Sequence, residues 1–259
     1  MSVLMNREKV SFIPTGTAMS NFKQNMDSFT EWTVLTTASD VADAALEIII
    51  LAAHTAIDDH GEFRIVLAGG STPERVYTLL AKRQENWNKW KFYLGDERCL
   101  PIDDPERNSH MIRSTLINNI DVPDENIHFI PSEKGAEAAA DLYLKIIEPA
   151  LPFDLVMLGM GEDGHTASLF PGDEHNQSEL VHAVHNAPKP PSERVSLSST
   201  CLSQTRQMLI MITGSGKKIA MKKWRDGDPI PVSQMSSLEK TTILLDIAAS
   251  PEYFNCKRL

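Results

Sequence analysis

The sequence predicts an α/β fold with a mostly parallel sheet and helices on both faces. Four short apolar runs each lead into a glycine-containing turn, and helical patterns separate these runs. Strands that alternate with helices are joined by parallel crossovers, which cover both faces of the sheet. The chain has 259 residues, of which 42% are hydrophobic, and this is enough for one sizeable core.

The N-terminal part of the chain changes character near residue 30. Residues 1–30 mix polar side chains with Met and Phe at no clear period, so we predict a partly ordered extension without assigned chemistry. A helix is then predicted from about Val41 to His60, because apolar residues recur at helical spacing between Asp40, its expected cap, and Gly61. Residues 31–259 are predicted to form a single α/β domain.

Further along the chain, strands and helices alternate. The strands are predicted at Phe63–Leu67, Lys91–Leu94, Asp154–Leu158 and Gln207–Ile212. Helices are predicted from Pro73, with Thr72 as cap, and over Ser109–Ile120 and Glu133–Ile147. Ligands of such folds bind beyond the carboxyl ends of the strands. We therefore expect the four turns to meet at one site.

Composition narrows the functional classes. A formal charge of −10 argues against nucleic-acid binding, which requires basic patches. No apolar run reaches the roughly 20 residues of a membrane span, and the N-terminus lacks the order of a signal peptide. A cytoplasmic location without a membrane partner is therefore expected. Cys99, Cys201 and Cys256 are too far apart for a disulfide framework or a zinc motif, so reduced thiols are expected.

The first turn, formed by Gly69, Gly70, Ser71 and Thr72, has the residues of an anion site. Glycines let backbone N–H groups approach a phosphate closely, and the N-terminus of the following helix adds a partial positive charge. The alternative is a plain strand-to-helix turn that binds nothing. The residues match neither the Walker pattern nor the dinucleotide pattern, so a nucleotide is not favoured.

The second and fourth turns add charged side chains. In the second turn, Arg98 could pair with phosphate oxygens, and Asp96 could orient a sugar hydroxyl or assist proton transfer. A surface ion pair is the alternative for this turn. In the fourth turn, Lys217 follows open glycine backbone, which suggests a second phosphate contact. A lysine on a helix surface is the alternative there.

The third turn carries a histidine. Gly159 and Gly161 release the chain from the strand, and His165 follows. An imidazole with a pKa near neutrality can take a proton from water as that water attacks a carbonyl. Asp163 or Glu162 could hold the tautomer of the ring. A turn histidine without a role is the alternative.

These motifs and their order resemble the 6-phosphogluconolactonases, relatives of glucosamine-6-phosphate deaminase. The likeness runs from about Phe63 to Ala249, and the run before Asn108 departs from the expected Asp-Ser-Asn by containing Pro105 and Glu106. The motifs are LAGGSTP (67–73), GDER (95–98), Asn108, GMGEDGHTASLFPG (159–172) and PKPPSERVSLS (188–198). The resemblance implies the Rossmann-like fold of the deaminase and of ribose-5-phosphate isomerase.

The resemblance also implies an activity: hydrolysis of 6-phospho-D-glucono-1,5-lactone, a step of the oxidative pentose phosphate pathway. His165 becomes the general base that activates water, with Asp163 as its supporter and Arg194 as a further substrate contact. The phosphate-side contacts become Gly70, Ser71, Arg98 and Lys217. A sugar-phosphate lactone is the expected partner of a monomer or homodimer, with no metal and no redox cofactor.

The sequence leaves three other functions as alternatives. In the deaminase, the Asp-Gly-His motif is followed by a segment that ends in Asn-Glu-Pro, whereas Ser168–Pro171 of this chain has no carboxylate. A sugar-phosphate sensor without catalysis would not need His165 and Asp163. A metal hydrolase is suggested only by His182 and His185, one helical turn apart near His175, and coincidence is favoured over ligation.

Overall fold

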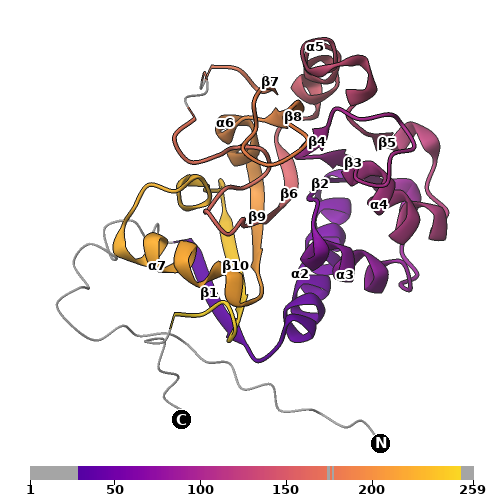
Figure 1. Ribbon diagram of the computed structural model, residues 1–259. Coiled ribbons are helices and arrows are strands. Elements are labelled where there is room, and N and C mark those ends of the chain that lie inside the picture. The colour runs from indigo at the N-terminus through magenta and orange to yellow at the C-terminus, as the bar shows by residue number, and fades with distance from the viewer. Residues whose placement is uncertain (1–28, 174–175, 177, 252–259) are drawn as a thin grey trace, which may run out of the picture.

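The computed structural model describes residues 29–173, 176 and 178–251, which form the α/β fold that the sequence predicts (Figure 1). Its main feature is a seven-stranded parallel sheet. In spatial order the strands are β1 (Thr30–Leu35), β10 (Lys240–Asp246), β9 (Thr205–Ile212), β6 (Phe153–Gly159), β2 (Phe63–Leu67), β3 (Trp90–Leu94) and β5 (Ile127–His128). The predicted extension, 1–30, lies outside the described residues except for its last two.

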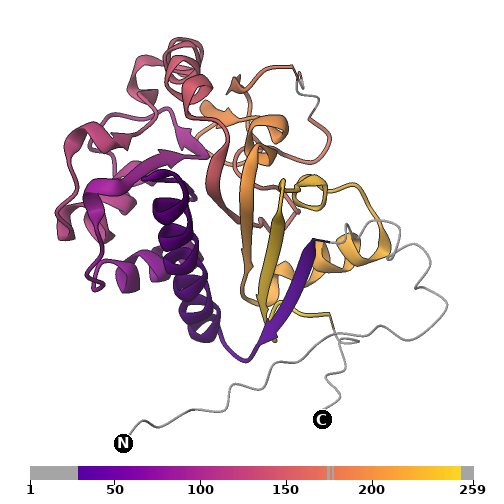
Figure 2. The ribbon, with the colours of Figure 1, turned by 180° about the vertical axis from the view of Figure 1, so that it is seen from behind.

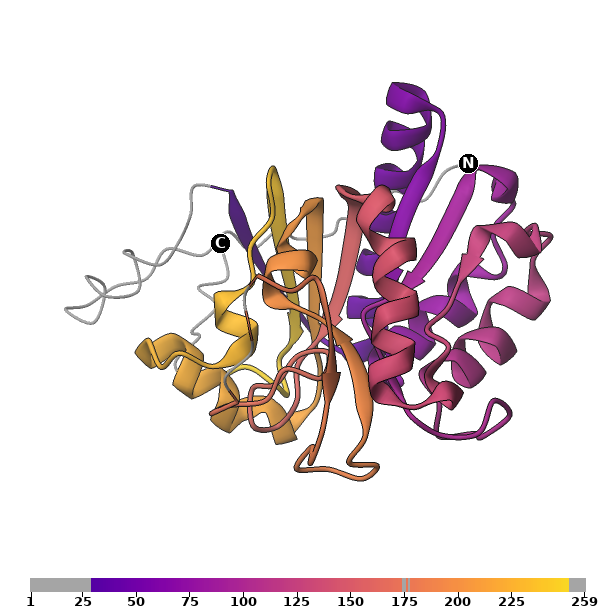
Figure 3. The ribbon, with the colours of Figure 1, turned by 90° about the horizontal axis from the view of Figure 1, so that it is seen from above.

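Helices cover both faces of this sheet. The α-helices are α2 (Ala38–His60), α3 (Ser71–Leu80), α4 (Asn108–Thr115), α5 (Ala136–Ile147), α6 (Ser199–Ser203) and α7 (Lys218–Asp226). Helix α2 runs along the sheet and contacts β1, β2, β6, β9 and β10 (Figure 2). Helix α7 packs on β1 from the other side, where the rings of Trp224 and Trp32 lie 4.9 Å apart (Figure 3).

Short 3₁₀ helices fill the connections. They are η1 (Trp87–Lys89), η2 (Ile117–Asn119), η3 (Asp124–Asn126), η4 (Ser132–Lys134), η5 (Glu148–Ala150), η6 (Ser215–Lys217) and η7 (Pro231–Gln234). The helix predicted over Ser109–Ile120 is divided into α4 and the 3₁₀ helix η2. The helix predicted over Glu133–Ile147 is divided into the 3₁₀ helix η4 and α5. Within the described residues, no helix is both long enough and apolar enough to cross a membrane.

All four predicted strands are present, with ends shifted by at most two residues. The central strand β6 is buried along its whole length except for Gly159. It is apolar from Leu155 to Leu158 because helices exclude water from both faces of a parallel sheet. The apolar runs of the sequence therefore mark the middle of the sheet reliably.

Both predicted helix caps are wrong. Helix α2 begins three residues before Val41, because Thr37 and Asp40 form a reciprocal capping box in which each side chain accepts the backbone N–H of the other. Helix α3 begins at Ser71, so Thr72 lies inside it and bonds through Oγ1 to the Thr213 hydroxyl at 2.6 Å. This contact joins the first predicted turn to the fourth.

The second predicted turn is a strand rather than a turn. Residues Asp96–Arg98 form β4, which pairs antiparallel with β8 (Arg194–Leu197), and β8 pairs with β7 (Val181–Val184). This small sheet packs against α5, and the β7–β8 hairpin extends away from the main sheet (Figure 3). This strand cannot be predicted from the charged residues of GDER, because the strand that pairs with them and buries them lies in a distant part of the chain.

Two buried tyrosines form hydrogen bonds with the backbone at the carboxyl ends of β2 and β3. The Tyr77 hydroxyl donates to the carbonyl of Ala68 at 2.8 Å and accepts its N–H at 2.9 Å. Tyr143 does the same for Leu94, at 3.0 and 2.8 Å. Burial raises the pKa of both phenols, so they remain neutral and can donate. Each phenol thus bonds both the N–H and the carbonyl of one residue, as a neighbouring strand would, at the sheet edge where the predicted site lies.

Candidate active site

The carboxyl ends of β2, β3, β6 and β9 open into a cleft of about 410 Å³, within the usual size range of small-molecule sites. All four predicted turns contribute to it. The predicted site residues that line it are Gly69, Gly70, Ser71, Thr72, Asp96, Arg98, His165, Arg194 and Lys217. Asp163 does not line the cleft, but it contacts His165. The structure therefore brings together every residue of the predicted lactonase site.

His165 is fixed by the turn that precedes it. Its Nδ1 lies 2.5 Å from Asp163 Oδ1, and its backbone N–H donates to the same oxygen at 3.2 Å. A Cβ added to Gly161 would come within 2.0 Å of His165 Nδ1, so only glycine allows the ring to approach the turn this closely. With Nδ1 engaged, Nε2 is the ring nitrogen left for a ligand.

The pKa values of this pair suit a base at neutral pH. Burial lowers the pKa of His165 below its ordinary value of 6.5, and the charge of Lys189 lowers it further, against the opposing effects of Asp163 and Asp96. Burial acts to raise the pKa of Asp163, but the hydrogen bonds and charge of His165 outweigh it, so that the pKa is lowered. The pair therefore combines a neutral imidazole with a carboxylate.

Asp96 faces the cleft from β4. Its side chain accepts the Ser168 hydroxyl at 2.6 Å and the Asn108 amide at 3.1 Å. Arg98, two residues on, donates through Nη1 to the carbonyl of Glu106, and its Nε is buried without a hydrogen-bond partner. Both side chains line the cleft, where a ligand can reach them.

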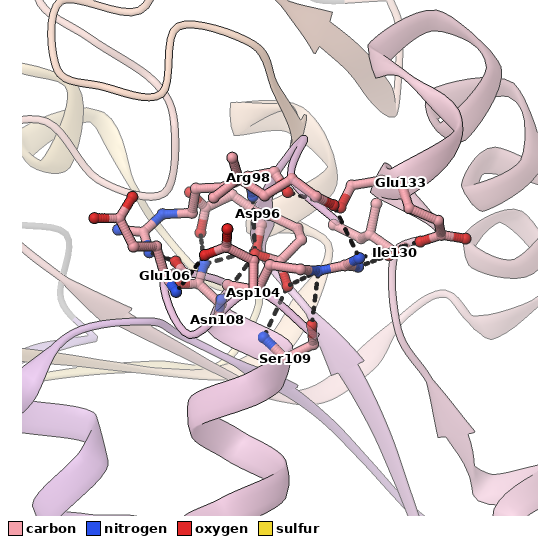
Figure 4. Close-up of polar contacts among 12 residues, drawn as sticks. Asp96, Arg98, Asp104, Glu106, Asn108, Ser109, Ile130 and Glu133 are labelled. Carbon is pink, nitrogen blue, oxygen red and sulfur yellow. Dashed lines mark hydrogen bonds and ion pairs between the residues drawn. The ribbon is translucent and has the colours of Figure 1, made fainter. Parts of the chain in front are cut away.

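Between them, Glu97 organises the wall of the cleft from inside. It is fully buried, which overturns the surface ion pair considered for GDER. Its carboxylate accepts the backbone N–H groups of Asn108 at 2.8 Å and Ser109 at 2.7 Å, at the N-terminus of α4. The buried Arg107 guanidinium lies 3.6 Å away and also contacts Glu133 and the Ile130 carbonyl (Figure 4). The chain between β4 and α4 is thus tied to a buried charge.

Lys189 is a cleft residue that the sequence analysis missed. It lies in the β7–β8 hairpin and lines the cleft together with Lys217. Burial lowers the pKa of Lys217, Lys189 adds to this effect, and Glu162 and Asp163 oppose it. The motif PKPPSER contains Lys189, but nothing in the sequence alone distinguishes it from a solvent-exposed loop lysine.

Arg194 lines the cleft but also holds this hairpin. Its Nε donates to the carbonyl of Pro191 at 3.0 Å and its Nη2 to the carbonyl of Lys189 at 2.8 Å. The guanidinium lies over the ring of Phe170 at 5.6 Å. Most of its donors are therefore engaged within the protein, and its clearest effect is to place Lys189.

Two of the three histidines considered as metal ligands lie in the described part of the chain, and their surroundings differ. His182 is buried in β7, whereas His185 is exposed and lies between Glu137 at 2.9 Å and Glu193 at 2.5 Å. His175 and Cys256 lie outside the described residues. Within the residues that the structure does describe, no group of three or more His, Cys, Asp or Glu side chains could hold a metal ion.

Comparison with known proteins agrees with this geometry. The family model described as glucosamine-6-phosphate isomerases/6-phosphogluconolactonase matches residues 36–244. The chain belongs to this family. Among curated members, the 6-phosphogluconolactonase of Mycobacterium leprae is 36% identical over 205 residues, covering 72% of this chain and 83% of that protein.

A solved member of the family shows the same fold. The crystal structure of 6-phosphogluconolactonase from Thermotoga maritima superposes with a TM-score of 0.79 at 30% identity, covering 84% of this chain and 99% of that one. A monomeric glucosamine-6-phosphate deaminase has a TM-score of 0.71 at 21% identity, a likeness that concerns the fold alone. Both branches of the family thus share the architecture, and the site residues must distinguish them.

Proposed function

We propose that this chain is a 6-phosphogluconolactonase that hydrolyses 6-phospho-D-glucono-1,5-lactone to 6-phosphogluconate, with His165 as general base. The observation that carries the proposal is the His165–Asp163 pair, 2.5 Å apart, in a cleft rich in cationic and glycine-turn donors. Curated family members that share a third of their residues with this chain are 6-phosphogluconolactonases, which supports the same reaction here.

The reaction needs one base and several donors. Nε2 of His165 takes a proton from water as the water oxygen attacks the lactone carbonyl, and a tetrahedral oxyanion forms. When the oxyanion collapses, the bond between the carbonyl carbon and the ring oxygen breaks, and His165 returns the proton to that oxygen. Asp163 holds Nδ1 throughout, which fixes the tautomer and stabilises the imidazolium.

The substrate phosphate requires positive charge in a protein whose net charge is −10. The cleft supplies it locally through Arg98, Lys189 and Lys217. The N-terminus of α3, where Ser71 begins the helix, adds backbone N–H groups and a partial positive charge. An anionic sugar phosphate is therefore the ligand class that fits these walls best.

The deaminase reaction fits less well. Residues 168–171 carry no carboxylate, and the hydroxyl of the fully buried Ser168 donates to Asp96. No second acid therefore stands beside His165 in that segment.

The proposed activity has a direct test. Purified protein should accelerate acidification of fresh 6-phosphogluconolactone well beyond the spontaneous rate, equally with and without EDTA. Ammonia release from glucosamine 6-phosphate, measured in parallel, should stay at background. Ammonia release without lactone hydrolysis would instead assign the chain to the deaminase reaction.

The pH profile should report the lowered pKa of His165. A base must be unprotonated to act, so kcat/KM should be constant near neutrality and fall as the pH drops through a pKa below 6.5. Asp163 raises that pKa, so Asp163→Asn should shift the acid limb to still lower pH as well as slow the reaction. Initial rates between about pH 5 and pH 8 would show both effects.

The shift in Asp163→Asn distinguishes this limb from titration of the substrate phosphate, whose pKa of about 6 belongs to the substrate and would not move. A matched control tests whether loss of any carboxylate has the same effect. Asp173→Asn removes an exposed carboxylate that is outside the cleft and should leave the limb unchanged. An acid limb at the same pH in the wild type and in Asp163→Asn would argue against His165 as the titrating base.

A further inference from the structure

Asp96 is held from two sides by neutral donors on distant parts of the chain. It is 7% exposed and lines the cleft from β4. Ser168 donates to its Oδ2 at 2.6 Å, and the Asn108 amide donates to its Oδ1 at 3.1 Å. Neither donor carries charge, so these two hydrogen bonds fix the direction of the carboxylate, and the nearby cation is Arg194, whose Nη1 lies 3.5 Å from Ser168 Oγ.

Ser168 reaches Asp96 through an unusual turn. Thr166 and Leu169 exchange two backbone hydrogen bonds, at 3.3 and 3.0 Å, and Ala167 between them has a φ of +48°. A non-glycine residue in this left-handed region is strained, and such strain is typically kept at functional sites. The turn begins one residue after His165, so the same motif that presents the base also directs Ser168 at Asp96.

Asn108, at the start of α4, is also held in place by several hydrogen bonds. Its Nδ2 donates to the Asp96 carbonyl at 2.9 Å as well as to the carboxylate (Figure 4). Its backbone N–H is bound by the buried Glu97 at 2.8 Å. A Cβ on Gly69 would come within 2.0 Å of Asn108 Oδ1, so the first turn leaves room for this side chain by carrying glycine.

The carboxylate retains capacity for a ligand. Two oxygens offer about four acceptor positions, and the protein occupies one on each oxygen with a side-chain donor. The negative charge of Asp96 also acts on His165, where it works to raise the imidazole pKa. Asp96 and His165 line the same cleft, and Ser168, which binds Asp96, follows His165 by three residues. We therefore expect Asp96 to face the part of the lactone that reacts, where the hydroxyl nearest to the carbonyl is the one on C2.

We propose that Ser168 and Asn108 are positioning residues that hold Asp96 as the acceptor for the 2-hydroxyl of the lactone. This inference rests on the proposed lactonase function. A carboxylate held at both oxygens accepts best from one direction, so its hydrogen bond to the 2-hydroxyl places the adjacent carbonyl against the water that His165 activates. Recognition of the hydroxyl and alignment of the carbonyl are then one event.

The test compares 6-phosphogluconolactone with its 2-deoxy analogue. The wild type should prefer the full substrate in kcat/KM by roughly tenfold to a hundredfold, the range for a hydrogen bond to a charged group. Ser168→Ala and Asn108→Ala should each lower kcat/KM for the full substrate about tenfold and leave the analogue nearly unchanged. Asp96→Ala removes the acceptor and should abolish the preference, and adding Ser168→Ala to it should have little further effect.

The controls make each outcome decisive. Ser114→Ala removes an exposed hydroxyl that bonds only the Met111 carbonyl, and it should leave both rates unchanged. If Ser168 and Asn108 had a purely structural role, their replacement would lower kcat/KM for both substrates by the same factor. That result would overturn the inference. Wild-type protein that ignores the 2-hydroxyl but hydrolyses the lactone overturns it alone, whereas inactivity on both lactones overturns the proposed function with it.

Discussion

Replacing His165 with asparagine is expected to lower kcat for the lactone by roughly a hundredfold to ten-thousandfold, the usual contribution of a general base. Asparagine is close in size and polar, so the turn around Asp163 should survive. KM should change little, because the cationic and backbone donors that line the cleft remain in place. Initial rates of acid release, corrected for spontaneous hydrolysis, measure the effect.

His54→Gln provides the matched control. His54 lies on α2, is exposed, and bonds only the Glu85 carboxylate at 2.9 Å, far from the cleft lining. Its replacement should leave kcat unchanged. If His165→Asn keeps the full rate while circular dichroism shows a native fold, the proposed mechanism fails even though the family assignment stands.

The largest effect on stability is expected at Glu97. Glu97→Gln removes a fully buried charge and presents an amide donor to backbone donors that the carboxylate now accepts. Arg107, itself 3% exposed, loses the more deeply buried of its two counter-charges and keeps Glu133 at 3.2 Å. Breaking a buried pair on one side should lower the free energy of unfolding by about 3 kcal/mol. Urea denaturation measures this loss directly.

Glu106→Gln is the natural comparison, since Glu106 is exposed and its carboxylate makes no contact with these backbone donors. That change should stay within about 0.5 kcal/mol of the wild type. A Glu97→Gln protein as stable as Glu106→Gln would show that Glu97 does not organise the β4–α4 segment.

The sequence predicts the central strands of the fold but not its edges. β2, β3, β6 and β9 are recognisable because burial on both faces requires continuous apolar runs. The polar residues of β4 are typical of a turn, and they form a strand only because Asp96 pairs with Ser196 of β8. Local sequence patterns do not show which distant segments pair. For the same reason β1, which pairs with β10, was not predicted.

The candidate site was more accessible to sequence reasoning than its supports were. Parallel strands direct their carboxyl ends to one edge, so the four turns could be expected to meet. The support of Asp96 by Ser168 could not, because Ser168 was interpreted only as a position without a carboxylate. Lys189 was missed for a similar reason, since Arg194 places it through contacts that no spacing reveals.

The two tyrosine hydroxyls at the ends of β2 and β3 divide the cleft into parts with different freedom to open. The amide protons of Ala68 and Leu94 are bonded by fully buried phenols, so they can exchange with solvent only when that packing opens. Lys189 is held differently: Arg194 bonds its backbone carbonyl at 2.8 Å, but its side chain reaches the cleft from the β7–β8 hairpin, which projects from the main sheet (Figure 3). The part of the cleft at the ends of β2 and β3 is thus ordered before any ligand binds. Most of the conformational entropy lost on binding should come from the hairpin that carries Lys189.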